Sequence, residues 1–335
     1  MKKLVIPGVI LLLFFLVGCP TQQTNNPECM DVEKAKTIYK SSDGDATKRC
    51  STMEVLEQHI AKSPNLKSRM ESIEKQCEAF IALRKSGKAN DLDVITIPTV
   101  VHVIYSKSEE NICNPQIVSQ IKVLNEDFTK TNTDIGQVPE EFSNLSANIR
   151  VHFELDTIIR VSSTRSEWGT NDQMKFSSNG GSNAIDSSTH LNIWVCNIGG
   201  GVLGYAQFPG DNTATDGIVI SPQFFGTEGS VSAPFNRGRT TTHEVGHWLN
   251  LRHIWGDGDC SLDDFVDDTP VSDAPNFGCP TYPTVRCNSN DITMNYMDYT
   301  DDACMYMFTQ GQKDRMRAVF ASGGPRESFP KAAVQ

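Results

Sequence analysis

Three histidines and a glutamate lie close together between His243 and His253. On a helix of 3.6 residues per turn, His243 and His247 stand one turn apart on the same face, so both imidazoles can bind one metal ion. Glu244 is rotated by roughly 100° from His243, which is too far for a ligand but close enough to take a proton from a water at the metal. The spacing therefore predicts a metal site with an adjacent general base.

His253 follows His247 by six residues, and a straight helix would carry it away from the ion. We expect the helix to end and the chain to turn back at Asn250, because asparagine tolerates the left-handed conformation better than most residues other than glycine. The pattern is then H-E-x-x-H-x-x-N-x-x-H. The alternative is an amphipathic helix with surface histidines.

The composition indicates an exported globular protein. The chain has 335 residues, of which 38% are hydrophobic, a formal net charge of -11 and an isoelectric point near 5.1. This content allows one large domain or two smaller ones. The absence of basic clusters argues against a nucleic-acid partner. Ten cysteines favour a compartment in which they can form disulfides.

The N-terminus has the pattern of an export signal. A short basic start precedes the apolar run Leu4–Val17, which is shorter than a membrane-spanning helix. The sequence ending at Cys19 resembles the lipobox of bacterial lipoproteins, which implies that residues 1–18 are removed, that Cys19 carries lipid and that membrane contact is through this lipid alone. Residues 20–27 would form a polar tether. An ordinary secretory signal and an uncleaved anchor are the alternatives to a cell-envelope lipoprotein.

Residues 28–90 are polar with a helical periodicity. Apolar residues recur there at three- and four-residue intervals, interrupted at Ser63-Pro64, which predicts amphipathic helices without a catalytic constellation. The segment 86–91 is rich in helix breakers, so we expect a domain boundary and a cleavage region there.

The sequence from Leu92 onward predicts an α/β layer. Residues 94–105 form a β-branched run typical of a buried strand. A helix is expected at about 115–130, and further strands at 149–158, 191–198 and 217–221. This order predicts a mixed sheet behind the metal helix.

Two other features of this region are predicted to have simpler roles. Residues 199–210 are glycine-rich without the context of a phosphate loop, and we expect an exposed edge strand that could bind an extended peptide. The remaining histidines are expected to be packed or surface residues without chemistry: His59, His102, His152 and His190.

Residues 257–273 are strongly acidic and contain no lysine or arginine. Oxygen ligands suit calcium, and we predict a calcium site at Asp264 and Thr269, with a solvated acidic loop as the alternative. Four cysteines in the same loop-rich region indicate a disulfide framework, whose three possible pairings the spacing leaves open. They are Cys260, Cys279, Cys287 and Cys304.

Three segments together resemble the pappalysin family of metzincin metalloproteases. They are HEVGHWLNLRHIWGD, DDFVDDTP and NYMDYTDDACMYMFTQGQKDRM, and the similarity covers roughly residues 92–322. The resemblance implies a metzincin-type α/β (α+β) domain at residues 91–335, with a mixed twisted sheet, a backing helix and the active-site helix. Its upper subdomain would span about 91–253, and a loop-rich, disulfide-stapled lower subdomain about 254–335. We expect the chain to be a monomer.

The resemblance also implies roles for single residues. His243, His247 and His253 would bind zinc, Glu244 would be the general base and acid, Met297 would form the Met-turn and Tyr299 would stabilise the oxyanion, with disulfides Cys260–Cys287 and Cys279–Cys304. Asn250 stands where the family has glycine. Ala303 stands where relatives that cleave before arginine or lysine have an acidic residue, which argues against that preference.

The early segment Arg49–Glu57 is similar to the pro-segments of bacterial relatives. Residues 19–90 would then be a tether and a helical pro-segment, in which Cys50 occupies the open zinc position. A structural disulfide of Cys50 with Cys29 or Cys77 is the alternative. The predicted function is a zinc metalloendopeptidase of proteins or peptides, made as a latent zymogen. A catalytically silent surface binding protein and a calcium-binding adhesin are the rival classes.

Overall fold

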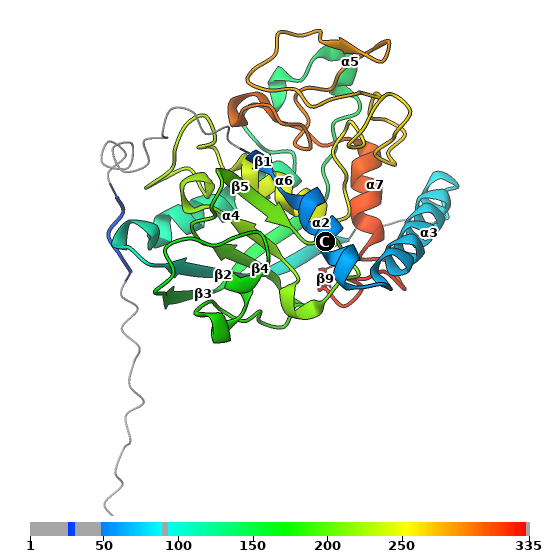
Figure 1. The fold of residues 1–335 in the computed structure, drawn as a ribbon. Helices are drawn as coiled ribbons and strands as arrows, with labels where there is room; N and C mark the ends of the chain where they lie inside the picture. Colours follow the sequence, from blue (N-terminus) through cyan, green and yellow to red (C-terminus); the bar gives the residue numbers. More distant parts are fainter. Residues whose placement is uncertain (1–25, 31–47, 89–92, 333–335) are drawn as a thin grey trace, which may run out of the picture.

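The computed structural model describes residues 26–30, 48–88 and 93–332. The predicted signal peptide and Cys19 lie outside these residues. Within them the chain builds a seven-stranded mixed sheet with helices packed on it (Figure 1). No helix of the described segments is both long enough and apolar enough to span a bilayer. The mixed α/β architecture predicted from the sequence is confirmed.

The long strand β2 (Val94–Tyr105) lies second from one edge of the sheet. β3 (Val151–Ser162) and β4 (Leu191–Val195) pair with it in parallel on its two sides. The short β9 (Lys331–Ala332) pairs with the start of β2 in antiparallel direction, so the end of the chain returns to the sheet. Strand β2 begins and ends near the limits predicted from its β-branched run.

The other half of the sheet reaches the N-terminal segment. β6 (Ile218–Ile220) lies parallel to β4, and β5 (Val202–Ala206) lies antiparallel to β6. β1 (Lys48–Cys50) pairs with β5 in parallel. All five residues of β5 are buried. The edge strand predicted in 199–210 is therefore present but not exposed in this form of the chain, because β1 pairs with it.

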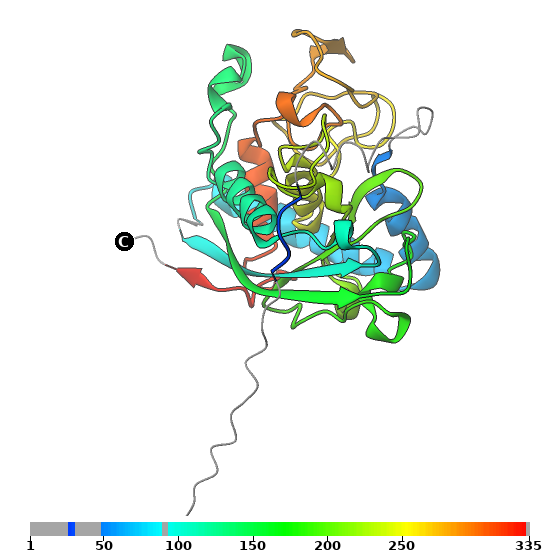
Figure 2. The ribbon, with the colours of Figure 1, turned by 90° about the vertical axis from the view of Figure 1, so that its left-hand side faces the viewer.

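Two helices cover one face of the sheet, as Figure 2 shows. α4 (Asn114–Phe128) packs Ile117, Leu124 and Phe128 against inward side chains of β2 and β3. α6 (Arg239–Trp248) lies beside it and is buried along its whole length. A second apolar cluster, built around Trp194 and Tyr205, fills the opposite face. The sheet therefore forms a rigid support behind α6.

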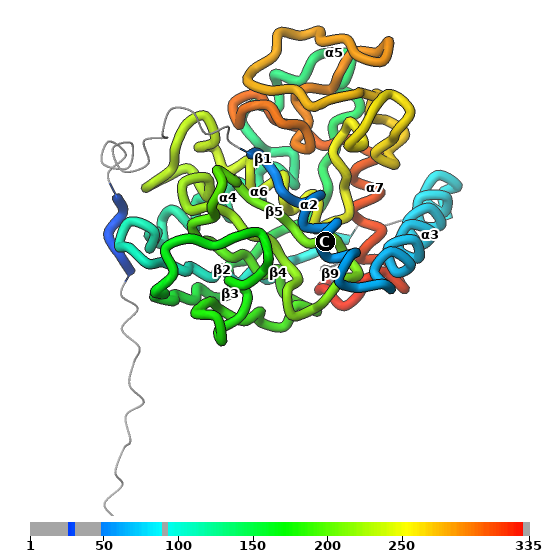
Figure 3. Tube along the Cα trace, in the orientation of Figure 1, coloured from blue at the N-terminus to red at the C-terminus, as the bar shows by residue number. Residues whose placement is uncertain are grey.

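The N-terminal helices lie across this framework (Figure 3). α2 (Thr52–Lys62) and α3 (Leu66–Lys85) are separated at the predicted break. α3 packs beside α7 (Gln310–Ala318), with ion pairs from Glu74 to Arg315 at 2.5 Å and from Arg84 to Asp314 at 2.8 Å.

The chain after α6 is rich in loops. Between Leu249 and α7 the structure has only the hairpin of β7 (Val285–Arg286) and β8 (Ser289–Asn290) and a short turn of 3-10 helix. The small helix α5 (Glu140–Ser143) lies over this region. Disulfides join Cys260 to Cys287 and Cys279 to Cys304, the pairs that the resemblance implies. A further disulfide joins Cys29 to Cys113.

Candidate active site

Helix α6 ends in the conformation that the sequence predicts at Asn250. Asn250 has a φ of 76°, in the left-handed region. The amide of Leu251 donates to the carbonyl of Gly246 at 2.9 Å, and the amide of Asn250 to the carbonyl of His247 at 2.9 Å. These two bonds form a Schellman motif, which satisfies the last carbonyls of the helix and reverses the chain. The turn brings His253 back to the helix.

The three imidazoles converge on one point. His247 Nε2 lies 3.2 Å from His243 Nε2 and 3.1 Å from His253 Nε2. All three side chains are buried. Burial lowers the pKa of His243 and His247 well below the ordinary value, so both rings are neutral. Neutral imidazole is the form that binds a metal ion.

The other nitrogen of each ring has an acceptor. His243 Nδ1 donates to Tyr296 O at 2.7 Å, His247 Nδ1 to Leu251 O at 2.8 Å, and His253 Nδ1 to Asp257 Oδ1 at 2.6 Å. His243 and His247 therefore carry the hydrogen on Nδ1 and keep the lone pair of Nε2. The three Nε2 atoms face one another at a distance that fits a shared cation.

Met297 lies beneath the histidine helix and is completely buried. A side chain at Gly246 would meet Met297 Sδ at 2.4 Å. Gly246 therefore has a packing role, which explains a glycine in the interior of a helix. Tyr299 follows two residues later, and its ring packs on His253 and His243 at centroid distances of 4.9 and 5.7 Å. The structure thus brings Met297 and Tyr299 to the histidines.

The N-terminal segment reaches the same point through Cys50. Four residues each offer one ligand atom here, and these four atoms all lie within 4.8 Å of one another: Cys50, His243, His247 and His253. Cys50 is a free, buried thiol, and Cys29 pairs with Cys113. The disulfides of Cys50 with Cys29 or Cys77 are therefore not formed. Zinc binds nitrogen and sulfur ligands, and four of them complete its tetrahedral coordination.

Glu244 is held by the same segment. Its Oε2 accepts hydrogen bonds from Thr52 Oγ1 at 2.8 Å and from the Cys50 thiol at 3.5 Å. Ala206 N donates to Thr52 Oγ1 at 2.9 Å, which ties the contact to β5. Burial raises the pKa of Glu244 to about 8. The carboxyl group is therefore enclosed and engaged as long as the segment is in place.

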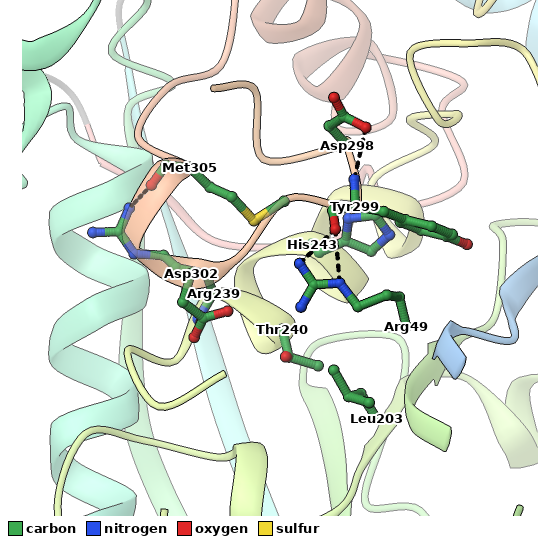
Figure 4. Close-up of a pocket in the computed structure, with 9 residues that line it drawn as sticks. All are labelled: Arg49, Leu203, Arg239, Thr240, His243, Asp298, Tyr299, Asp302 and Met305. Carbon is green, nitrogen blue, oxygen red and sulfur yellow. Dashed lines mark hydrogen bonds between the residues drawn. The ribbon is translucent and has the colours of Figure 1, made fainter. Parts of the chain in front are cut away.

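Arg49 enters a pocket beside His243 (Figure 4). Arg49 Nε and Nη2 donate to Tyr299 O at 3.0 and 2.8 Å. Its guanidinium lies 3.8 Å from the centre of the Phe235 ring. Asp302 lines the same pocket, and its carboxylate accepts hydrogen bonds from two backbone amides. A basic side chain therefore fits this pocket although Ala303 carries no acid.

A buried polar network fixes the start of α6. Asp127 on α4 accepts hydrogen bonds from Thr242 Oγ1 at 2.7 Å and from the Tyr296 hydroxyl at 3.0 Å. Arg239 donates to the Tyr296 hydroxyl at 2.7 Å and to Met305 O at 2.7 Å. Tyr296 also accepts the hydrogen of His243 Nδ1 at its carbonyl. The network therefore couples α4, the histidine helix and the methionine turn.

The predicted calcium residues lie together in the acidic loop. Thr269 Oγ1 lies 2.9 Å from both carboxylate oxygens of Asp264, and the Val266 amide donates to Asp264 at 3.0 Å. Burial raises the pKa of Asp264 well above the ordinary value. Within the described segments, Asp264 belongs to no group of three histidine, cysteine or carboxylate ligands. The geometry thus brings Asp264 and Thr269 together, and calcium at this place stays a prediction.

The whole arrangement has counterparts among solved structures. Mature mirolysin of Tannerella forsythia, in complex with a cleaved peptide, aligns with a TM-score of 0.69 and 47% identity over 70% of this chain and 95% of that chain. A promirolysin mutant of T. forsythia aligns with a TM-score of 0.75 and 42% identity over 84% of this chain and 96% of that chain. The larger share covered by the pro-form shows that the match extends beyond the mature protease.

Sequence relatives have a related description. Residues 179–321 match the peptidase family described as pregnancy-associated plasma protein-A. Extracellular metalloprotease 1 of Coccidioides posadasii is 34% identical over 256 residues, which are 72% of this chain and 83% of the relative. The chain belongs to the pappalysin family. An extracellular metalloprotease of Arthroderma benhamiae is 33% identical over 76% of this chain and 83% of that protein. This pappalysin is therefore a zinc metalloendopeptidase.

Several residues of this pappalysin site were not predicted from sequence. Thr52 binds Glu244, Arg49 fills the pocket, Asp257 orients His253, and Arg239 and Asp127 hold the helix. The glycine of H-E-V-G-H was a usable signal, because a helix-interior glycine indicates close packing. Thr52 had no signal, since its partner lies 192 positions away in the chain.

Proposed function

We propose that His243, His247 and His253 hold the catalytic zinc of this metalloendopeptidase, and that the chain is made as a latent zymogen with Cys50 at the fourth position. The observation that supports both parts is the convergence of these four ligand atoms in one buried group. Residues 19–90 would then be the tether and pro-segment, and residues 91–335 the catalytic domain.

A zinc ion held there would supply Lewis acidity, which makes a water molecule more acidic and polarises the scissile carbonyl. Glu244 would accept the proton of the attacking water and transfer it to the leaving amine, which contributes roughly 10²–10⁴-fold. The Tyr299 hydroxyl would donate to the developing oxyanion. Tyr296 O, Leu251 O and Asp257 would hold the three imidazoles in the tautomer that exposes Nε2.

Latency in this proposal has three components. Cys50 would fill, as a thiolate, the position that a water needs, and Thr52 would engage Glu244 Oε2. β1 would also occupy the edge of β5, where an extended peptide could add as a strand. Removal of the pro-segment would free the metal position, the base and the edge together.

We also infer that the pocket beside His243 selects a basic side chain of the substrate. Arg49 supports this inference, because its guanidinium donates a hydrogen bond to the Tyr299 carbonyl and lies over the Phe235 ring. The residues that line this pocket include Asp298 and Asp302. Cleavage profiling of the activated enzyme on a peptide library should show arginine or lysine enriched at one subsite. A profile with no basic preference would refute this inference.

Export, lipid and calcium complete the proposal. The disulfides and the extracellular relatives support export. The lipobox-like sequence ending at Cys19 supports a cell-envelope lipoprotein with Cys19 as the lipidated residue. A calcium ion at Asp264 and Thr269 would neutralise a buried carboxylate. If so, a calcium-selective chelator should lower the unfolding temperature by a few degrees, and an Asp264→Asn variant should lose that response.

The catalytic assignment is tested by Glu244→Gln. This variant should retain one zinc per chain by metal analysis, because Glu244 is not a ligand, while cleavage of a denatured protein falls at least about 10²-fold. Tyr299→Phe should also retain zinc and lower kcat by roughly 10²–10³-fold. Retained turnover in Glu244→Gln, or loss of its zinc, would contradict the assignment.

A further inference from the structure

The disulfide between Cys29 and Cys113 joins the N-terminal segment to the catalytic part of the chain. Cys113 directly precedes α4 and is buried. Asn26 Oδ1 accepts a hydrogen bond from the amide of Asn114 at 3.0 Å. Residues 26–30 are therefore attached to the start of α4, at the edge of the molecule opposite α3 in Figure 1.

The attachment point is firmly held by Arg160 of β3. Arg160 Nη1 donates to Asn111 Oδ1 at 2.6 Å and to Ile112 O at 2.7 Å, and Nη2 donates to Asn114 Oδ1 at 2.6 Å. These acceptors lie on both sides of Cys113 in the sequence. The disulfide thus ends in the rigid framework of the catalytic part.

The segment that carries Cys50 is consequently bonded to the catalytic part at both ends. On one side the connection is Cys29–Cys113, and on the other it is the peptide chain from α3 into β2. A single cut between α3 and β2 leaves Cys50 joined through Cys29. A single cut between Cys29 and Cys50 leaves it joined through α3. In both cases Cys50 stays tethered at an effective concentration on the order of millimolar.

We propose that Cys113 is the attachment site through which the mature protease keeps its N-terminal peptide, and that two peptide-bond cuts are needed to free Cys50 from the metal site. Two hydrolytic cuts release the pro-segment while the disulfide is unchanged. The peptide that begins at Cys19 then remains covalently bound beside α4. This inference rests on the proposed latency and lipidation, and it places the mature protease at the membrane.

The test uses sites for a sequence-specific protease, inserted after Met30, after Gly87, or at both places. Each singly cut protein should migrate as one unit on a denaturing gel without reductant and stay latent at every dilution. The doubly cut protein should gain activity on dilution and keep its N-terminal peptide until a reductant is added.

The matched control is the double variant Cys29→Ser/Cys113→Ser. When cut after Gly87 alone, it should release the pro-segment on dilution, with an apparent affinity about 10²–10⁴-fold weaker than in the tethered protein. In the producing cells, the mature protease should fractionate with membranes, whereas the mature form of the double variant should be soluble.

Full activity of the unaltered disulfide protein after one cut would overturn the proposal, as would fragments that separate without reductant. If the mature forms of the unaltered protein and of the double variant fractionate with membranes to the same extent, the disulfide does not retain the lipid anchor. If the doubly cut protein keeps its peptide but cleaves nothing, the proposed catalytic residues are at fault and the attachment stands.

Discussion

Cys50 and Cys77 are two free, buried thiols of the N-terminal helical segment, in different surroundings. Cys50 lies with the three histidines, and its thiol donates to Glu244. Cys77 lies on α3, where the side-chain amide of Asn250 donates from Nδ2 to the Cys77 sulfur at 3.6 Å. Burial raises the pKa of both thiols. Cys77 therefore provides a control for the loss of a buried thiol in the same segment.

Cys50→Ser should make the uncut chain at least about tenfold more active than the unaltered zymogen, since loss of a ligand contact worth 1.4 kcal/mol already gives that factor. Cys77→Ser should leave latency unchanged. The measurement is hydrolysis of a peptide by the uncut proteins, with zinc content determined in parallel. Equal latency in Cys50→Ser and the unaltered protein would contradict the role of Cys50 in latency. The pairing of β1 with β5 would then be the main barrier to substrate binding.

At the scale of elements, the end of α6 decides where the third histidine lies. The Schellman bonds and the positive φ of Asn250 reverse the chain between His247 and His253. A residue with a larger penalty for this conformation would strain the turn and displace His253. The strain acts on stability and on metal binding together.

Asn250→Ala should lower the free energy of unfolding by about 1–2 kcal/mol, because alanine tolerates the left-handed region poorly. Asn250→Gly should be neutral or slightly stabilising in comparison, although it also removes the contact with Cys77. Urea unfolding measures the free energy of unfolding. The rate of zinc transfer to a chelator reports on the metal site, and this rate should be faster in Asn250→Ala. An alanine variant as stable as the glycine variant would contradict this account.

At the scale of the whole molecule, ion pairs join the N-terminal helices to the catalytic part. His59 on α2 lies 2.8 Å from Asp172 and 2.5 Å from Asp211. Burial alone would lower the pKa of His59, but hydrogen bonds and charges from Asp172 and Asp211 outweigh it and raise the pKa to about 9. The sequence predicted a packed or surface residue without a catalytic or metal-binding role at His59. In the structure His59 holds α2 against the catalytic part through these two ion pairs.

This pKa gives the docking a pH dependence. The folded pKa is higher than the ordinary 6.5, so the stabilisation is fully present below pH 6.5 and is lost as the pH rises through about 9. The unfolding temperature of the zymogen should fall by about 2–4 °C more between pH 6.5 and 9.5 than that of His59→Gln. His190→Gln, a change at a partly exposed histidine, should behave like the unaltered protein. Parallel curves for His59→Gln and the unaltered protein would refute the docking role.

The sequence alone determined the features that depend on local geometry. His243 and His247 share a face because helical spacing fixes their directions, and Asn250 marks the turn because few side chains accept a positive φ. The strand β2 and the helices α2, α3 and α4 followed from periodicity for the same reason. Each of these depends on neighbours within a few residues.

Only the tertiary structure decided which distant segments meet. Whether β5 is an open edge depends on β1, which comes some 150 residues earlier in the chain. The partner of Cys29 is Cys113, at a sequence separation of 84, and no spacing rule selects it. Disulfide and strand partners are set by how the sheet and helices pack, because contacts between distant residues depend on the whole arrangement and leave no local pattern in the sequence.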